Sequence, residues 1–230
     1  MPTLLITGAN RGIGLELTRQ YLEGGWNVLA CCRQPDQADE LKQLQSDNTM
    51  LSIHSVDVGN EQSIKQLAEE LKGKSIDVLL NNAGIYGGSG NKLGSITSDQ
   101  WLEVFKVNTI GPLLMAQVFL DQVASSDKKT IATISSKVGS IEDNQSGSNY
   151  MYRSSKTAVN QAMKSLSIDA SGLGIKAVVL HPGWVLTDMG GPNALINTQQ
   201  SASGLKAVLD NLKMEQSGQF INYDGSEIPW

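Results

Sequence analysis

With 230 residues, 40% hydrophobic content and a formal net charge of −5, the chain can bury one large core, and we expect a single domain over residues 1–230. The net negative charge and the lack of a basic cluster do not indicate binding to nucleic acid or to an anionic membrane, so a small-molecule partner is favoured. No signal sequence opens the chain and no apolar run approaches the roughly 20 residues that cross a bilayer, which predicts a cytoplasmic protein.

Short apolar segments of strand character alternate with helical patterns along the chain. The predicted strands are Thr3–Thr7, Asn27–Cys32, Met50–Val56, Ile76–Leu80, Thr130–Ser135, Ile175–Leu180 and Gln219–Asn222. Their apolar character suits a parallel sheet that is buried on both faces. We therefore predict an α/β fold, a doubly wound parallel sheet of about seven strands with helices on both faces. Right-handed crossovers place the carboxyl ends of the strands along one edge, where such sheets bind ligands.

The first predicted strand leads into the glycine-rich turn Thr7-Gly8-Ala9-Asn10-Arg11-Gly12-Ile13-Gly14 and then into a helical pattern. Gly8, Gly12 and Gly14 remove side chains where the backbone must turn tightly, approach a pyrophosphate and let the helix pack on the strand. The N–H groups at the start of the helix favour an anion. The spacing departs from the G-x-G-x-x-G of most dinucleotide folds, but the order of strand, turn and helix predicts a Rossmann-type dinucleotide site.

The second predicted strand ends in Cys31-Cys32-Arg33, where many NAD-binding proteins place an acid that receives the ribose hydroxyl. An arginine there, with Arg11 in the glycine turn, suits a 2′-phosphate, so we expect NADP(H) as cofactor. The alternative is that both arginines are exposed solubilising charges. The adjacent cysteines point to opposite faces of a strand, which indicates reduced thiols, and with only two histidines in the chain no metal site is expected.

Polar and small residues also follow the third and fourth predicted strands. Asp57, followed by Val58, can accept a hydrogen bond from an adenine amino group or cap the next helix. The fourth strand ends in Asn81-Asn82-Ala83-Gly84, which can let a cofactor pass close to the backbone but is also an ordinary turn sequence. Asn108 lies within the next apolar helix, where an asparagine either braces buried backbone or forms a kink that holds water next to Lys156.

Two segments carry groups suited to proton transfer. The fifth strand ends in Ile134-Ser135-Ser136, which places one or both hydroxyls at the same edge of the sheet. Tyr152 and Lys156 are four residues apart, so on a helix their side chains share one face. The ammonium would favour the phenolate and lower the pKa of the phenol from about 10 toward the range of proton transfer at neutral pH. Tyr150 has Ser154 at the corresponding position, so only Tyr152 has a lysine partner.

Taken in order, these motifs resemble those of the short-chain dehydrogenase/reductase family, and the resemblance covers almost the entire chain. It depends on Thr7–Gly14, Asp57, Asn81–Gly84, Asn108, Ser135-Ser136, Tyr152 with Lys156, and Pro182-Gly183 followed by Thr187. Within the family, the segment His181–Gly191, together with Asn222–Gly225 and Pro229-Trp230, is most similar to the carbonyl reductases of the sniffer and C-factor group.

The resemblance implies an NADPH-dependent oxidoreductase that reduces aldehyde, ketone or quinone carbonyls by hydride transfer. It implies that Tyr152 donates the proton and Ser136 holds the carbonyl oxygen. Lys156 would support Tyr152, hold the nicotinamide ribose and connect through water to Asn108, which completes the expected catalytic set. The expected cofactor contacts are Gly8, Asn10, Arg11, Gly12, Ile13, Gly14, Arg33, Asp57, Val58, Asn82, Ala83, Gly84, Tyr152, Lys156, Pro182, Gly183, Val185 and Thr187.

The substrate pocket is expected beside the loop after Gly84, and a lid over residues 184–214 is expected to order when ligand binds. The expected pocket residues are Ser136, Ile141, Tyr86 and Trp184. Core or loop packing is the alternative interpretation of each large apolar residue.

Two other functions stay open from the sequence. One is an NAD-dependent alcohol dehydrogenase of the same fold, and the other is a dinucleotide-binding signalling protein of the C-factor type. Long helices expected over Gln100–Val123 and Tyr150–Ser171 are those through which family members often pair, which suits a homodimer or homotetramer.

Overall fold

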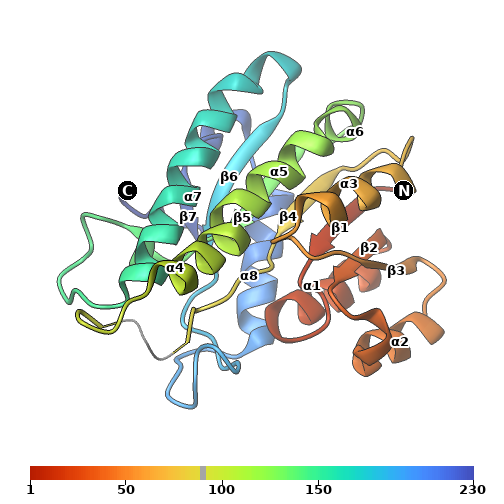
Figure 1. Ribbon diagram of the computed structural model, residues 1–230. Helices are drawn as coiled ribbons and strands as arrows, with labels where there is room; N and C mark the ends of the chain where they lie inside the picture. The colour runs from red at the N-terminus through yellow and green to blue at the C-terminus, as the bar shows by residue number, and fades with distance from the viewer. Residues whose placement is uncertain (89–91) are drawn as a thin grey trace.

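A parallel sheet of seven strands runs through the computed structural model, which describes residues 1–88 and 92–230. The strand order is β3-β2-β1-β4-β5-β6-β7, and each neighbouring pair is parallel (Figure 1). The strands are β1 (Thr3–Thr7), β2 (Asn27–Cys32), β3 (Leu51–Ser55), β4 (Val78–Asn81), β5 (Thr130–Ile134), β6 (Lys176–His181) and β7 (Phe220–Asn222). The order reverses between β1 and β4, and doubly wound sheets bind ligands at such a reversal.

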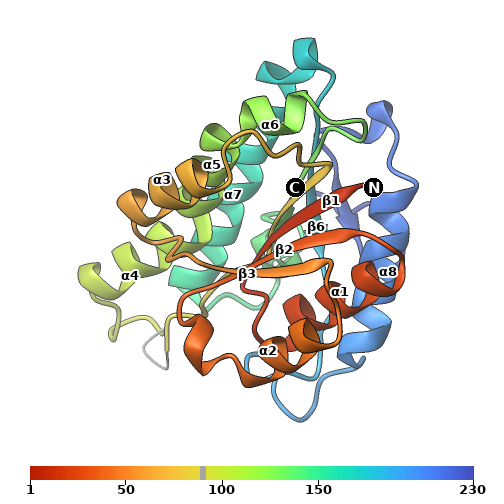
Figure 2. The same cartoon turned by 90° about the vertical axis from the view of Figure 1, so that its right-hand side faces the viewer.

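Helices cover both faces of this sheet, as Figures 1 and 2 show together. In the described residues the α-helices are α1 (Gly12–Glu23), α2 (Asp39–Ser46), α3 (Glu61–Glu70), α4 (Ser98–Phe105), α5 (Gly111–Val118), α6 (Leu120–Ala124), α7 (Tyr150–Asp169) and α8 (Thr198–Asp210). One face packs on α1, α2 and α8 through residues such as Leu17, Leu41 and Leu205. The opposite face packs on α3 and α5 through Ile64 and Met115, and α7 lies over β6.

The alternation of side chains along each strand explains the two cores. Leu4 and Ile6 of β1 enter the core on the α1 side, whereas Leu5 enters the core on the α3 side, and all three are fully buried. A strand that is buried on both faces therefore consists of consecutive apolar residues. The predicted fold is confirmed as a doubly wound parallel sheet in a single domain.

Strand boundaries agree closely with those predicted from the sequence. β1 and β2 begin and end at the predicted residues, and most other ends differ by one residue. β4 begins at Val78 instead of Ile76, because the Ile76 N–H donates to the Gln122 carbonyl of α6 at 3.1 Å and not to a neighbouring strand. An apolar residue can thus belong to the core without belonging to the strand.

The helix expected over Gln100–Val123 is interrupted, which corrects that prediction. A π-helical turn over Lys106–Ile110 separates α4 from α5, and Phe119 separates α5 from α6. Pro112 explains the first interruption, because it has no N–H and its ring would collide with the carbonyl of Asn108 in a regular α-helix. The wider π turn relieves that collision at Asn108, the asparagine that is unusual within an apolar helical pattern.

Candidate active site at the carboxyl edge of the sheet

The glycine turn between β1 and α1 has a shape that side chains would disrupt. Gly8 has a φ of +66°, and a β carbon there would lie 2.9 Å from the Ala83 Cα atom. A β carbon on Gly14 would lie 2.2 Å from the Gly8 carbonyl oxygen, whereas one on Gly12, with φ +56°, would meet only the Thr187 methyl group at 3.5 Å. Within the described residues no side chain caps α1, so its first N–H groups are suited to the anion of a dinucleotide.

The turn after β4 is fastened to the glycine turn. The Thr7 hydroxyl accepts hydrogen bonds from the backbone N–H groups of Asn82 and Ala83, both at 3.1 Å. The Asn82 side chain returns bonds to the carbonyls of Thr7 at 2.9 Å and Gly8 at 3.1 Å. Asn10 and Ile13 are half-buried in the same turn. The two segments predicted to contact a dinucleotide are therefore side by side.

The residues expected at the adenine end follow β2 and β3. Arg33 is exposed directly after β2, and Asp57 is exposed after β3. The Asp57 carboxylate accepts from the Gly59 N–H at 2.9 Å, while Asn60 is the residue that caps α3. Asp57 thus does not cap the helix, which was one of its two predicted roles. Val58 is only 7% exposed, so its side chain belongs to the core.

Asn108 is a buried brace between three segments. Its side chain accepts from the Ile85 N–H at 2.9 Å and donates to the Ile85 carbonyl at 2.8 Å and the Ser155 hydroxyl at 3.1 Å. The π turn provides the kink that the sequence suggested, and the brace joins α7 to the backbone just after Gly84. A β carbon on Gly84 would lie 3.3 Å from the Asn108 Oδ1 atom and 3.5 Å from the Lys156 Nζ atom.

Tyr152 and Lys156 lie on one face of α7, as expected from their spacing. The Lys156 side chain is buried, with its Nζ atom 5.7 Å from the centre of the Tyr152 ring and 2.9 Å from the Ile134 carbonyl, to which it donates. The Tyr152 phenol is half-buried, 3.9 Å from the Met189 sulfur, and its ring centre lies 4.9 Å from that of Tyr86.

The predicted lowering of the Tyr152 pKa is wrong for the protein's own groups. Burial raises the pKa of Tyr152 to about 12, a hydrogen bond with Ser136 opposes the rise, and Tyr86 adds to it. Burial also lowers the pKa of Lys156 to about 8, because a low-dielectric site disfavours the charged form of either group. The Lys156 ammonium lies over the Tyr152 ring, and burial is the largest of the effects on the pKa of the phenol.

Ser136, and not Ser135, lies beside the phenol. Ser135 is buried and donates to the Asn160 side chain of α7 at 2.6 Å. Ser136 is half-buried, interacts with Tyr152 and accepts from the Val138 N–H at 3.4 Å. The serine beside the phenol is thus the one that the family resemblance implied, while Ser135 is directed toward α7.

The segment after β6 folds against itself and against the glycine turn. Pro182 and Gly183 follow β6, and the Pro182 carbonyl accepts from the Ser201 hydroxyl of α8 at 2.6 Å. Val185 is buried and pairs with Ile196 in an isolated bridge. The Thr187 methyl group would lie 3.5 Å from a β carbon on Gly12. These residues therefore lie at the same edge as the glycine turn.

The predicted lid divides into a loop and a helix. Residues 184–197 form the loop, drawn in light blue between β6 and α8 at the lower end of Figure 1. Its Trp184 ring donates to the Gly190 carbonyl at 2.8 Å, and its Asp188 pairs with Arg11 at 2.6 Å. Thr198–Asp210 form α8, whose Leu205 is buried in the core, whereas the loop lies outside the core except at the buried Val185.

The residues expected in the substrate pocket differ in their exposure and contacts. Tyr86 contacts Tyr152, as does Met189 of the loop. Trp184 and Ile141 are 50% and 72% exposed, and their apolar surfaces face solvent. One contact was not foreseen from the sequence, namely the hydrogen bond that His181 accepts from the Lys137 N–H. The sequence signal for this contact was the position of His181, a polar residue at the end of a strand and directly before Pro-Gly.

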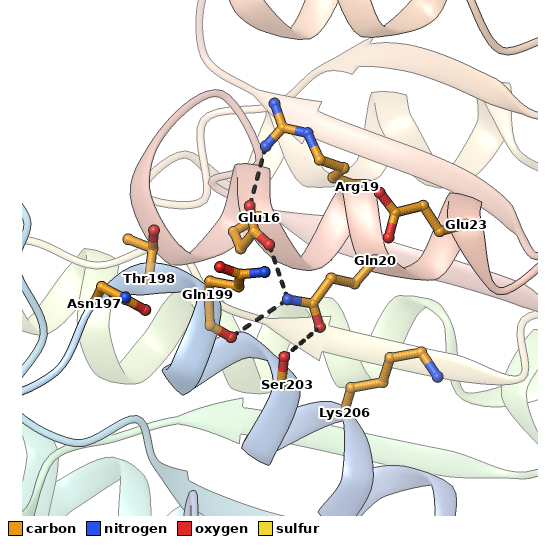
Figure 3. Close-up of a pocket in the computed structure, with 9 residues that line it drawn as sticks. All are labelled: Glu16, Arg19, Gln20, Glu23, Asn197, Thr198, Gln199, Ser203 and Lys206. Carbon is orange, nitrogen blue, oxygen red and sulfur yellow. Dashed lines mark hydrogen bonds and ion pairs between the residues drawn. The ribbon is translucent and has the colours of Figure 1, made fainter.

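A separate surface hollow of about 670 Å³ lies between α1 and α8 (Figure 3). Its polar groups bond to one another: Gln20 donates to Glu16 at 2.8 Å and accepts from Ser203 at 3.2 Å. None of the residues that line it belongs to the group around Tyr152. It is a polar seam between two helices, and its hydrogen bonds are explained by helix packing.

Two other kinds of site are not found in the part of the chain that the structure describes. No helix there combines the length and apolar character needed to cross a bilayer. No group of three or more histidine, cysteine, aspartate or glutamate side chains is placed to hold a metal ion in residues 1–88 and 92–230. Cys31 and Cys32 are buried free thiols.

Comparisons with known proteins place the chain in a family. The sequence model described as short chain dehydrogenase matches residues 2–200. C-signal of Myxococcus xanthus is 40% identical over 155 residues, which cover 67% of this chain and 93% of that protein. The carbonyl reductase Sniffer of D. melanogaster is 34% identical, has a TM-score of 0.94 and covers 100% of both chains. An NADPH-bound carbonyl reductase from chicken fatty liver is 37% identical, with a TM-score of 0.93 over 100% of this chain and 99% of that one. The protein therefore belongs to the short-chain dehydrogenase family of oxidoreductases, as its motifs predicted.

Proposed function

We propose that the protein is an NADP(H)-dependent carbonyl reductase for aldehydes, ketones or quinones, with Tyr152 as proton donor. The observation that carries the proposal is the convergence of the Tyr152 phenol, the Ser136 hydroxyl and the Lys156 ammonium next to Gly84, in the turn that is bonded to the glycine turn. The two similar carbonyl reductase structures support the same reaction class.

The cofactor site that we propose begins at the glycine turn. The missing side chains of Gly8, Gly12 and Gly14 leave the backbone open to a pyrophosphate at the start of α1. Arg11 and Arg33 are exposed cations at the same edge, which supports a 2′-phosphate, as does the NADPH bound to the chicken enzyme. Further proposed contacts are Asn10, Ile13, Asp57, Val58, Asn82, Ala83, Gly84, Pro182, Gly183, Val185 and Thr187.

When bound, NADPH supplies the hydride that goes to the carbonyl carbon of the substrate. Ser136 donates a hydrogen bond to the carbonyl oxygen, and Tyr152 gives its proton to that oxygen as negative charge develops there. A pKa of about 12 keeps the phenol protonated at pH 7, and an alkoxide is a much stronger base than a phenolate. The phenol is thus in the protonated form that a proton donor requires.

Lys156 is assigned the positioning of the ribose end of the cofactor. One of its three donors is used on the Ile134 carbonyl. We assign the other donors to the nicotinamide ribose and to a water that connects to Asn108, on the side where Gly84 has no side chain. The ammonium also favours any negative charge left on Tyr152 after proton transfer.

The residues around the phenol support a neutral substrate. Tyr86 and Met189 contact Tyr152, while Trp184 and Ile141 offer exposed apolar surface at the expected pocket. None of these four side chains carries a charge, so they can cover an apolar carbonyl compound but cannot pair with an ionised one. We propose that the loop of residues 184–197 acts as the lid.

Replacing the proton donor tests this function. Tyr152→Phe keeps the ring beside Tyr86 but removes the hydroxyl, so we expect carbonyl-dependent NADPH oxidation to fall at least about 100-fold. NADPH affinity, measured by fluorescence titration, should stay within about threefold of wild type. Tyr150→Phe, on the same helix without a lysine partner, is the matched control and should retain turnover. Full activity in Tyr152→Phe would contradict the proposal.

Two alternatives give different results in the same assay. An NAD-dependent alcohol dehydrogenase would use NADH better than NADPH across a carbonyl panel, and Arg33→Asp would change that preference little. The similarity to C-signal favours, as a second candidate, a signalling protein that binds the dinucleotide. Such a protein would bind NADPH but leave it unoxidised with each carbonyl tested.

A further inference from the structure

The turn that carries Ser136 is held to β6 by a histidine. His181 ends β6, and its Nδ1 atom accepts a hydrogen bond from the Lys137 N–H at 3.2 Å. Main-chain pairing between β5 and β6 finishes with a bond from the Ser135 N–H to the Leu180 carbonyl at 2.8 Å. The imidazole therefore adds one side-chain hydrogen bond beyond the last main-chain bond, directly next to Ser136.

The two ends of this turn are anchored differently. At the far end, the Gly139 N–H donates to the Ser136 carbonyl at 2.8 Å, and the Gly139 carbonyl accepts from the Thr157 hydroxyl of α7 at 2.8 Å. A β carbon on Gly139 would lie 2.8 Å from that of Lys156, so this end is pressed against α7. At the near end, the Ser136 hydroxyl accepts from the Val138 N–H at 3.4 Å, which is a long bond. The His181 bond is shorter and joins the near end to a different strand.

The ring of His181 has the protonation state that this bond needs. To accept from an N–H group, Nδ1 must carry a lone pair, so the imidazole must be neutral. Burial lowers the pKa of His181 to about 4, and the nearby Lys137 ammonium also lowers it, while Asp224 and Asp143 act in the opposite direction. The acceptor is therefore present throughout the physiological pH range.

We propose that His181 is a positioning residue whose Nδ1 atom orients the peptide between Ser136 and Lys137, so that the Ser136 hydroxyl faces Tyr152. This inference depends on the role given to Ser136 in the proposed function. A peptide group is planar, so holding the Lys137 N–H also holds the Ser136 carbonyl and the backbone of Ser136. Since a displacement of about 1 Å can cost a reaction 100-fold, we expect a loss of about tenfold when the acceptor is removed.

Two substitutions of His181 separate its acceptor from its bulk. His181→Leu removes the acceptor and should lower kcat about tenfold with little change in KM for NADPH. His181→Asn places an amide oxygen near the position of Nδ1 and should stay within about threefold of wild type. His54→Leu makes the same change at the other histidine, which bonds to Glu70 away from the site, and should leave kcat unchanged. An Asn variant as slow as the Leu variant would overturn the proposal.

A double-mutant cycle tests whether His181 acts through Ser136. In a Ser136→Ala background the hydroxyl is already gone, so His181→Leu should cost less than about twofold further. The same tenfold loss in both backgrounds would show that the histidine acts elsewhere, and it would overturn the proposal. Thermal melting of each variant confirms that the comparison is made on folded protein.

Amide hydrogen exchange tests the geometry without turnover. The Lys137 N–H should exchange slowly in wild type and in His181→Asn, and at least about tenfold faster in His181→Leu. Fast exchange at Lys137 in wild type would overturn the proposal whatever the kinetics. Failure of the proposed function gives a different result. The Lys137 N–H would then be protected from exchange, but NADPH would not be oxidised with any carbonyl. That result would overturn the positioning role together with the proposed function.

Discussion

Among single residues, the candidate site contains a buried charged group, the Lys156 ammonium, which weakens folding. Lys156 is 4% exposed, and it donates a hydrogen bond to a neutral partner, the Ile134 carbonyl. Burial lowers the pKa of Lys156 to about 8, so the folded protein holds its proton less tightly than the unfolded chain does. Folding is therefore weakened wherever the unfolded chain keeps the lysine charged.

This linkage has a defined sign. A folded-state pKa of about 8 against an ordinary value near 10.5 means that burial costs about 3 kcal/mol below pH 8, and that the cost disappears as pH rises toward 10.5. We expect Lys156→Met to gain stability relative to wild type at pH 7 and to lose that advantage by pH 10. Urea unfolding at both pH values measures this, with Lys72→Met on the surface as control. Parallel pH profiles for wild type and Lys156→Met would contradict the argument.

Residue identities in the candidate site could be predicted from spacing, but their environments could not. The i, i+4 relation brought Tyr152 and Lys156 to one face of a helix. Burial, which decides the pKa of both, depends on packing by residues distant in sequence such as Tyr86. The strand pattern alone likewise left Ser135 and Ser136 open, because it placed the strand end one residue late, and the preference for Ser136 came from the family resemblance.

At the scale of elements, the loop of residues 184–197 is joined to the start of α1 by one ion pair. The Arg11 guanidinium and the Asp188 carboxylate lie 2.6 Å apart, and their side chains are 69% and 81% exposed. Exposed pairs stabilise a fold by less than about 1 kcal/mol, so this pair matters little for stability. Its effect is to occupy the arginine that the sequence assigned to a cofactor phosphate.

Removing the carboxylate should release that arginine. We expect Asp188→Asn to tighten NADPH binding about threefold at low ionic strength, with the gain fading as salt screens exposed charges. Glu69→Gln breaks an exposed pair with Lys72 on the far side of the sheet and serves as the matched control. Titration calorimetry at low and high salt makes the measurement. Unaltered or weaker NADPH affinity in Asp188→Asn would show that the pair does not compete with the cofactor.

Most elements could be predicted because their patterns are local. Apolar runs bounded by turns located each of the seven strands, and the ends differed by at most two residues. The helix over 100–123 was predicted as continuous, because its apolar pattern continues across Pro112. Only the three-dimensional collision between that ring and the preceding turn explains the π-helical interruption, and it is this interruption that carries Asn108.

At the scale of the whole molecule, the site is built where two halves of the sheet meet. β1 to β3 form one half and β4 to β7 the other, and the strand order reverses between β1 and β4. At the carboxyl edge of the sheet, beyond the pairing of β1 with β4, the halves are joined by the hydrogen bonds between Thr7 and the Asn82-Ala83 turn. The glycine turn proposed for the cofactor belongs to the first half, and Ser136, Tyr152 and Lys156 belong to the second, so the proposed reaction requires this junction to hold.

Gly14 is the point at which the junction can be tested. A β carbon there would lie 2.2 Å from the Gly8 carbonyl oxygen and 2.5 Å from the Asn82 Nδ2 atom. It would therefore push against the glycine turn of the first half and against the Asn82 turn of the second. Alanine is favoured over glycine in a helix by about 1 kcal/mol, but we expect this clash to outweigh that gain and destabilise Gly14→Ala by about 2 kcal/mol. NADPH affinity should fall more than about tenfold, because the turn that meets the pyrophosphate is displaced.

Gly172 provides the matched substitution for this prediction. It lies in a short turn after α7 with nothing within 4 Å of its missing β carbon, so Gly172→Ala should change stability by less than about 0.5 kcal/mol. Thermal unfolding and NADPH titration of both variants compare a glycine required by packing with one that is not. If Gly14→Ala and Gly172→Ala behaved alike, close packing at the reversal of the sheet would not be what holds the two halves in register.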